Sequence, residues 1–195
     1  MNEMRCWYTP VFEDIIDRSS DQDREDVARF ISNLTKTVVS REFSNSGGWQ
    51  SPIYRKGDVT QFESILDKIQ LKMDIVCQQL KMNLSITNYW INVNYKSNSN
   101  LHHIHPDSIL SGVVYLDASS DQGSLRLMYP SRDIIQYGLH TLKLMSLSSL
   151  YDDIVIHPMT DKVVIFPSYI PHCVEPNKTD RPRVSLAFNV AYPSK

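Results

Sequence analysis

The stretch SITNYWINVNY, residues 85–95, alternates between two kinds of side chain toward its end. Ile91, Val93 and Tyr95 occupy one set of alternate positions, and the intervening positions hold a tryptophan and two asparagines. Because successive side chains of a β-strand point to opposite faces of a sheet, these two sets are expected on opposite faces. The stretch therefore predicts a strand.

Several further segments of residues 84–195 also predict short strands. SILSGVVYLD (108–117) is rich in β-branched residues, SLRLMY (124–129) alternates, DKVVIFPSYIPHCV (161–174) is apolar and interrupted by two prolines, and RPRVSLAFNVAY (181–192) is the last. SDQG (120–123) predicts a turn, and residues 138–153 predict a long connection. Many short strands at similar spacing favour a sandwich or barrel of jelly-roll type.

The first 83 residues predict helices instead. Residues 19–40 begin with serine and aspartate, which favour a helix N-terminus, and a second helix fits residues 58–82. Their apolar residues recur at helical spacing: Val27, Phe30, Ile31, Leu34 and Val38 in the first, and Phe62, Ile65, Leu66, Ile69, Met73, Val76 and Leu80 in the second. SNSGGWQSPIY (44–54) predicts a loop between them. The expected fold is mainly β with flanking α-helices.

Composition narrows the class of protein. A chain of 195 residues with 42% hydrophobic content suits one domain, residues 1–195, in which residues 1–83 form a helical support and residues 84–195 the β core. The net charge of −2 and the absence of a basic run disfavour nucleic acid or an anionic membrane as partner. Three scattered cysteines, no long apolar stretch and no signal-peptide pattern favour a cytoplasmic protein with reduced thiols.

The segment NLHHIHPDS, residues 100–108, holds three of the six histidines. On an extended chain His103, His105 and Asp107 share one face, whereas His102 points to the other. Two chelating pairs are possible, His103 with His105 or His105 with Asp107. Imidazole and carboxylate groups suit Fe(II), Zn and Cu sites, so the segment predicts half of a metal site.

A third metal ligand is expected from another strand, and the remaining histidines are the candidates: His140, His157 and His172. His172 follows a buried strand and two prolines, which would hold its side chain in a fixed position. On the last predicted strand, Arg183 and Ser185 project to the same face, where a guanidinium and a hydroxyl can grip a carboxylate. Arg181, beside Pro182, is a weaker alternative to Arg183.

Three motifs carry a resemblance to a known family: HIHPDSILSGVVYL (103–116), IFPSYIPHCV (165–174) and RVSLAFNV (183–190). In this order and spacing they resemble the Fe(II)/2-oxoglutarate-dependent dioxygenases. The match looks closest to a branch of uncharacterised bacterial and phage proteins with a His-x-His-Pro motif, and it covers nearly the whole chain. If the chain is virus-encoded, the cytoplasm in question would be the host's.

The resemblance implies a double-stranded β-helix, that is, a cupin-like jelly roll, and a hydroxylase that uses Fe(II), 2-oxoglutarate and O2 and releases succinate and CO2. It implies His103, His105 and His172 as iron ligands, with Asp107 as the alternative to His103. Arg183 and Ser185 would then anchor the far carboxylate of 2-oxoglutarate. Four further residues would line the pocket or cover it: Trp90, Asn92, Asn94 and Trp49. The substrate would be a protein or a small molecule.

One alternative keeps the fold and the histidines but changes the chemistry. A cupin-like metal-binding protein, or a metalloenzyme of another class, needs the metal ligands but not the Arg183 anchor. A site of three histidines also suits zinc.

Overall fold

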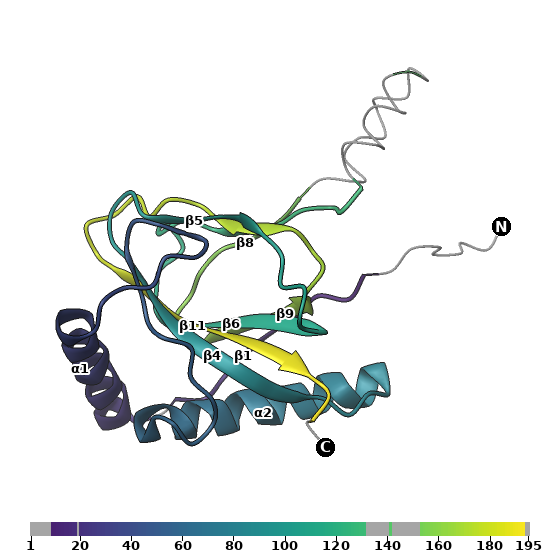
Figure 1. Cartoon of the computed structure of the whole chain (residues 1–195), viewed down its shortest axis with the longest axis horizontal. Helices are drawn as coiled ribbons and strands as arrows, with labels where there is room; N and C mark the ends of the chain where they lie inside the picture. The colour runs from purple at the N-terminus through teal and green to yellow at the C-terminus, as the bar shows by residue number, and fades with distance from the viewer. Residues whose placement is uncertain (1–8, 19, 132–140, 142–152, 194–195) are drawn as a thin grey trace.

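The computed structural model describes residues 9–18, 20–131, 141 and 153–193, which form two helices and two antiparallel sheets (Figure 1). The major sheet has the strand order β1 (Phe12–Ile15), β9 (Lys162–Pro167), β6 (Leu110–Asp117), β11 (Arg183–Ala191), β4 (Ser85–Asn94) and β3 (Trp49–Gln50). The minor sheet has the order β2 (Asn45–Ser46), β5 (Ser99–His103), β10 (His172–Val174), β7 (Leu125–Leu127) and β8 (Ile154–Ile156). This is the predicted jelly-roll arrangement.

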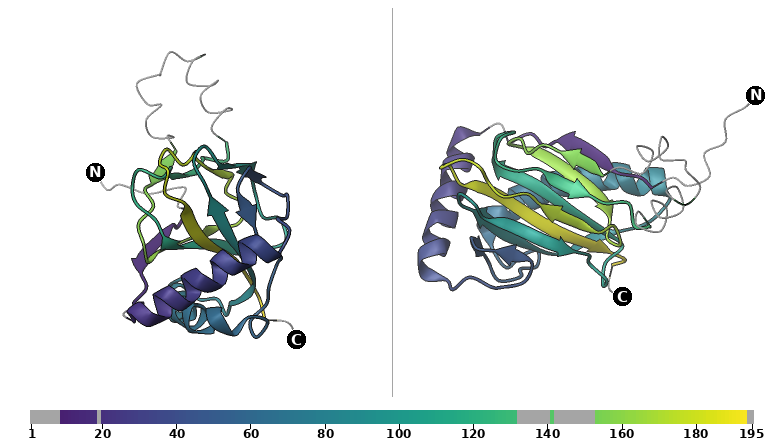
Figure 2. Two further views of the ribbon diagram at one scale, coloured as in Figure 1. Left: turned by 90° about the vertical axis from the view of Figure 1, so that its left-hand side faces the viewer. Right: turned by 90° about the horizontal axis from the view of Figure 1, so that it is seen from above.

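Helix α2 packs on the outer face of the major sheet, away from the minor sheet, and α1 packs against α2 at one end of the sheet (Figures 1 and 2). Helix α1 (Asp21–Thr37) begins at Ser20, whose side chain accepts a hydrogen bond from the backbone N–H of Asp23. Helix α2 (Thr60–Leu80) ends at Lys81, which adopts the left-handed conformation with φ 54°. The apolar residues of both predicted helices pack into a hydrophobic core that they share with the major sheet. Within the described residues, neither helix is long and apolar enough to cross a membrane.

Strand β11 lies at the centre of the major sheet and pairs with β4 on one side and β6 on the other. Leu186, Phe188 and Val190 face the helices and are fully buried in the core. The alternate residues of β11 face the minor sheet, where Arg183 is opposite Asn94 and Ser185 is opposite Asn92. The alternation in the sequence thus separates a core face from a face toward the space between the sheets.

The segment before residue 84 does more than provide helices. Its short strands β1, β2 and β3 pair with β9, β5 and β4 respectively. Strands of two to four residues are too short to show an alternating pattern, which explains why the helical description of this segment missed them.

Part of the space between the sheets is filled by a second apolar cluster. Its buried members are Leu125, Leu127, Ile156, Val164, Phe166 and Ile170. Polar residues and histidines line the rest of that space, so the inter-sheet region is divided into an apolar part and a polar pocket.

Candidate metal centre and carboxylate pocket

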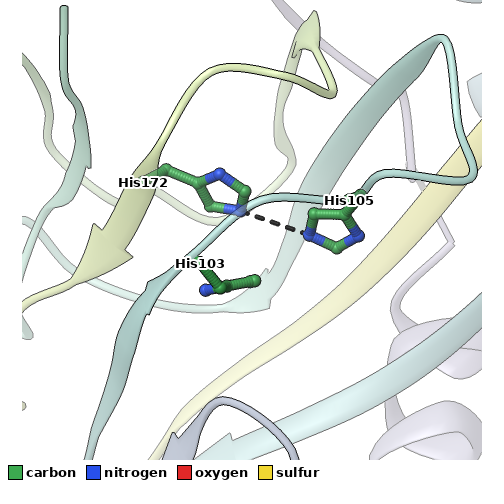
Figure 3. A group of neighbouring side chains, drawn as sticks. All are labelled: His103, His105 and His172. Carbon is green, nitrogen blue, oxygen red and sulfur yellow. Dashed lines mark hydrogen bonds between the residues drawn. The ribbon is translucent and has the colours of Figure 1, made fainter. Parts of the chain in front are cut away.

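Three histidines from different segments come together between the sheets (Figure 3). His103 ends β5 and is directly opposite His172, the first residue of β10, while His105 follows β5 by two residues. One ring nitrogen from each lies within 4.8 Å of the others. The ring centroids of His103 and His172 are 4.2 Å apart, and the Nε2 atoms of His105 and His172 are 3.3 Å apart. The arrangement can hold a metal ion.

Backbone carbonyls orient two of these rings. Nδ1 of His103 donates to the carbonyl oxygen of Leu101 at 2.7 Å, and Nδ1 of His172 donates to the carbonyl oxygen of Ile170 at 2.9 Å. Since the proton resides on Nδ1, each Nε2 keeps a free lone pair. Such hydrogen bonds orient histidine ligands in metalloproteins.

Burial keeps the three imidazoles neutral. It lowers the pKa of His172 to about 3 and that of His105 to about 4, and it also lowers the pKa of His103. Burial acts in this direction because it penalises the charged imidazolium. Neutral imidazole is the form that binds a metal ion, so the cluster needs no deprotonation at neutral pH.

The other metal-ligand candidates lie elsewhere. Asp107 is exposed and does not belong to the group of close ligand atoms. Nδ1 of His157 lies 3.0 Å from the hydroxyl of Ser124, outside the cluster. His102 is exposed, and His140 falls outside the described residues.

A narrow pocket between the sheets connects the histidines with Arg183. Its lining combines the three histidine rings with a set of polar side chains from the major sheet and β5: Asn92, Asn94, Asn100, Ser111, Tyr115, Arg183 and Ser185. The pocket thus brings together the two halves that the sequence predicted separately, a histidine cluster and an Arg-x-Ser pair.

Arg183 is buried, with only 1% of its surface exposed, yet its guanidinium is not fully paired. Nη1 donates to the carbonyl oxygens of Gln122, Gly123 (2.9 Å) and Glu175 (3.4 Å). Nη2 is buried and has no hydrogen-bond partner among the described residues. An unpaired buried donor is costly and calls for an acceptor, and burial alone already lowers the pKa of Arg183. A carboxylate ligand would supply such an acceptor.

The turn predicted at SDQG forms part of the surroundings that hold the side chain of Arg183. Gly123 adopts φ +86°, and a Cβ there would collide with the carbonyls of Glu175 and Pro176 and approach Nη1 of Arg183. Only glycine combines this backbone conformation with such close approach. The sequence pattern indicated a turn but gave no sign that it supports the arginine.

Two polar side chains lie beside Ser185, and only one of them, Asn92, was predicted from the sequence to line the pocket. Asn92 on β4 and Tyr115 on β6 are its neighbours in the sheet. Oδ1 of Asn92 is buried without a hydrogen-bond partner in the described part of the chain, and burial raises the pKa of Tyr115 to about 12. Tyr115 could have been found from the alternation of SILSGVVYLD, once its pairing with the last strand was known.

The predicted pocket-lining residues divide into two groups. Trp90 stacks on His105, with ring centroids 5.7 Å apart and planes 20° apart, and Asn92 and Asn94 line the narrow pocket. Trp49 instead packs into the hydrophobic core, where its Nε1 donates to the carbonyl oxygen of Val38 at 2.9 Å. Trp49 is paired with Val93, whose side chain faces the core, and partners in neighbouring strands share a face.

A wider cleft of about 480 Å³ opens on the exposed side of the histidines. Ser44, Trp90, His103 and His105 line both the cleft and the narrow pocket. The rest of the cleft is formed mainly by the segments on either side of β2, by β5 and by the segment after β5: Phe43, Gln50, Ile53, Leu101, His102, Ile104, Pro106, Asp107, Ser108 and Asn189. Among the described residues that line it, there is no lysine or arginine.

The sequence matches the family described as "Putative 2OG-Fe(II) oxygenase" over residues 88–189. This range includes the pocket-lining residues of β4, β6 and β11 and all three clustered histidines. No curated protein matches the sequence as a relative.

Solved structures with the same fold belong to oxygenases of this kind. A prolyl-4-hydroxylase from Pseudomonas putida is 16% identical, with a TM-score of 0.68 over 95% of this chain and 94% of that one. The carbocyclase SnoK from nogalamycin biosynthesis is 12% identical, with a TM-score of 0.63 over 94% and 80%. HygX from Streptomyces hygroscopicus, solved with nickel and 2-oxoglutarate bound, is 12% identical, with a TM-score of 0.59 over 94% and 83%.

The family match covers more than half of the chain, and the structural likeness extends over nearly all of it. The structure also places a cluster of three histidines and a buried, partly unpaired guanidinium along one pocket. The protein therefore belongs to the 2-oxoglutarate- and Fe(II)-dependent oxygenases, with 2-oxoglutarate and O2 as cosubstrates.

Proposed function

We propose that the protein hydroxylates its substrate with Fe(II) held by His103, His105 and His172 and with 2-oxoglutarate held by Arg183 and Ser185. The observation that carries the proposal is the unpaired Nη2 of Arg183, buried in the same pocket as the histidine cluster. A structural arginine would be expected to satisfy all its buried donors within the protein. Arg183 lines the pocket, so a ligand bound there could supply the missing acceptor.

When bound, Fe(II), 2-oxoglutarate and O2 supply the oxidation, which yields succinate, CO2 and hydroxylated substrate. The chain's own contribution is positional and electrostatic. The three imidazoles would hold the metal ion and leave room on it for the cosubstrates. Arg183 offers a positive charge and a free N–H to the far carboxylate, in a pocket from which bulk water is largely excluded.

The ligand set of three histidines has a charge consequence. Neutral imidazoles leave the 2+ charge of the metal uncompensated, whereas a set with Asp107 would neutralise part of it. The near carboxylate of 2-oxoglutarate would supply one negative charge at the metal, since its far carboxylate would pair with Arg183. The exposed position of Asp107, outside the group of close ligand atoms, supports the three-histidine set.

The wider cleft is the proposed substrate site because it opens directly on the histidines. Phe43, Ile53, Leu101 and Ile104 give it an apolar lining, and its described lining lacks lysine and arginine. This chemistry suits an uncharged or apolar group of a peptide or small molecule and not a polyanion such as nucleic acid. By their names, the prolyl-4-hydroxylase with the same fold acts on prolyl groups, and the carbocyclase acts in the biosynthesis of a small molecule, nogalamycin.

Anaerobic titration tests this proposal. Fe(II) and 2-oxoglutarate together are expected to produce a visible metal-to-ligand charge-transfer band that neither produces alone. Arg183→Ala should weaken 2-oxoglutarate binding at least about 100-fold, because a desolvated charged hydrogen bond is lost. Arg181→Ala is the matched control, since Arg181 is exposed and pairs with Asp117.

Absence of the band in the folded wild-type protein would contradict the proposal. Equal loss of 2-oxoglutarate binding in both arginine variants would remove Arg183 as the specific anchor. Thermal unfolding of each variant, compared with wild type, separates loss of the ligand from loss of the fold. A cupin-like zinc protein, which the family match does not favour, would bind metal but give no response to 2-oxoglutarate.

A further inference from the structure

A row of polar side chains crosses the major sheet beneath His105, and none of them belongs to the proposed ligand set. Asn88 on β4, Asn189 on β11 and Ser111 on β6 are neighbours in register. Nδ2 of Asn189 donates to Oδ1 of Asn88 at 3.1 Å, and the hydroxyl of Ser111 donates to Oδ1 of Asn189 at 3.1 Å. Ser111 is in turn 2.8 Å from the hydroxyl of Ser168. These bonds fix which way the Asn189 amide points.

The row also touches His105 at two places. The backbone N–H of His105 donates to the carbonyl oxygen of Ser168 at 3.0 Å. The side chain of Asn189 lies beside the imidazole ring of His105, and both residues line the wider cleft. Because Nδ2 of Asn189 already donates to Asn88, the amide oxygen is the group that can accept a hydrogen bond from the ring.

His105 differs from the other two histidines in its surroundings. His103 and His172 each donate from Nδ1 to a backbone carbonyl two residues earlier. His105 lies outside any strand, and no carbonyl partner of its ring is recorded within the described residues. Its Nε2 faces His172, while its other ring nitrogen points away from both neighbouring rings (Figure 3).

We propose that Asn189 is the positioning residue for His105: its amide oxygen accepts a hydrogen bond from Nδ1–H of His105 and so presents Nε2 to the metal. Asn88 and Ser111 hold the amide in the orientation that makes this possible. The inference rests on the proposed ligand set and extends it, because each of the three histidines would then have an acceptor that fixes its ring. Partners of this kind commonly change metal affinity by roughly 10–100-fold when removed.

The test uses the full-length protein loaded with Co(II), without 2-oxoglutarate or substrate. Nδ1–H protons of histidines bound to Co(II) give strongly shifted, exchangeable NMR signals, which persist in water only when a hydrogen bond slows their exchange. Wild type is expected to show three such signals. Asn189→Leu, similar in size but unable to accept a hydrogen bond, should show two and should bind Co(II) roughly 10–100-fold more weakly.

Two further variants make the result specific. Asn189→Asp keeps the acceptor, and the Asn88 amide can turn its NH2 group toward the new carboxylate, so the third signal and the affinity should return. Thr87→Val is the matched control: Thr87 donates to the backbone carbonyl of Asn189 at 3.2 Å, so this variant alters the same strand pair but not the amide. It should keep three signals and bind Co(II) within about twofold of wild type.

The outcomes separate this inference from the proposed function. Three signals and unchanged affinity in Asn189→Leu would overturn the role of Asn189 alone. A loss of affinity that Asn189→Asp fails to restore, or that Thr87→Val reproduces, would mark a general packing effect and also overturn it. If folded wild type shows no set of three signals with Co(II), the ligand set itself is wrong and the inference falls with it.

Discussion

The two faces of β11 carry opposite chemistry along the same nine residues. On the helix side, Leu186, Phe188 and Val190 are fully buried among apolar neighbours. On the pocket side, Arg183, Ser185 and Asn189 are polar, and one buried guanidinium nitrogen is left without a partner in the described structure. Burial on the first face stabilises the fold, whereas burial on the second costs free energy unless a ligand is bound. Stability and binding are therefore expected to respond to different substitutions on one strand.

The largest expected effect is on the helix side. Phe188→Ala should lower the free energy of unfolding by about 3–5 kcal/mol, because it removes a fully buried ring and leaves a cavity. Urea denaturation followed by circular dichroism measures this. The molecules that remain folded should bind Co(II) within about twofold of wild type. A large drop in metal affinity per folded molecule would show that the two faces are not independent.

A change on the pocket side should give the reverse result. His172→Ala is expected to reduce Co(II) affinity at least about 100-fold, or about 3 kcal/mol, because it removes one of three ligands. Added metal should raise the melting temperature of wild type and not that of the variant. His157→Ala serves as the control, since His157 bonds Ser124 and lies outside the cluster. Retention of metal stabilisation in His172→Ala would refute the ligand assignment.

The histidines should also make the metal-free protein sensitive to acid. Their folded-state pKa values are lowered, to about 3 for His172 and about 4 for His105, so between these values and about 6.5 the unfolded chain binds more protons. Stability should therefore fall as pH drops through this window, by up to about 1.4 kcal/mol per pH unit for each such histidine.

Urea denaturation at several pH values between 4.5 and 7 measures this slope, with metal removed by a chelator. Carboxylates that are ion-paired in the folded state add to the slope at its acidic end, so the informative quantity is a difference. His172→Ala should have a shallower slope than wild type, and His157→Ala should not. Identical slopes in all three proteins would show that the cluster does not exclude protons in the folded state.

The smallest expected effect distinguishes the two possible near ligands. Asp107→Ala should change Co(II) affinity by less than about twofold, because Asp107 is exposed and outside the cluster. His103→Ala should weaken binding by roughly the same factor as His172→Ala. The opposite ranking, measured by competition with a chromogenic chelator, would restore Asp107 as the partner of His105.

The parts of the fold that sequence could predict depend on local patterns. Alternation in residues 85–95 and 181–192 identifies β4 and β11 and separates their faces, because side-chain direction in a strand follows from position alone. Helical spacing likewise identifies α1 and α2. The histidines and Arg183 stood out by residue type and spacing.

The parts that sequence could not predict depend on contacts between distant segments. Trp49 was expected near the site, but pairing with Val93 turns it into the core. The contact between Asn189 and His105 joins residues 84 positions apart in the chain, and no local pattern encodes it. The position of Arg183 similarly depends on Gly123, in a turn about 60 residues earlier. Gly123 must pack closely against the carbonyl of Glu175 for its own carbonyl to accept from the guanidinium.

The direct pairing of His103 with His172 has a consequence for how the chain reaches its fold. The register of β5 and β10 shifts just beyond this pair, so few ladder bonds define their alignment. A slip by one residue would turn one imidazole to the opposite face of the sheet, and a bound metal ion would oppose such a slip. Refolding in the presence of metal should therefore give a higher yield of correctly aligned protein than refolding without metal followed by addition of metal.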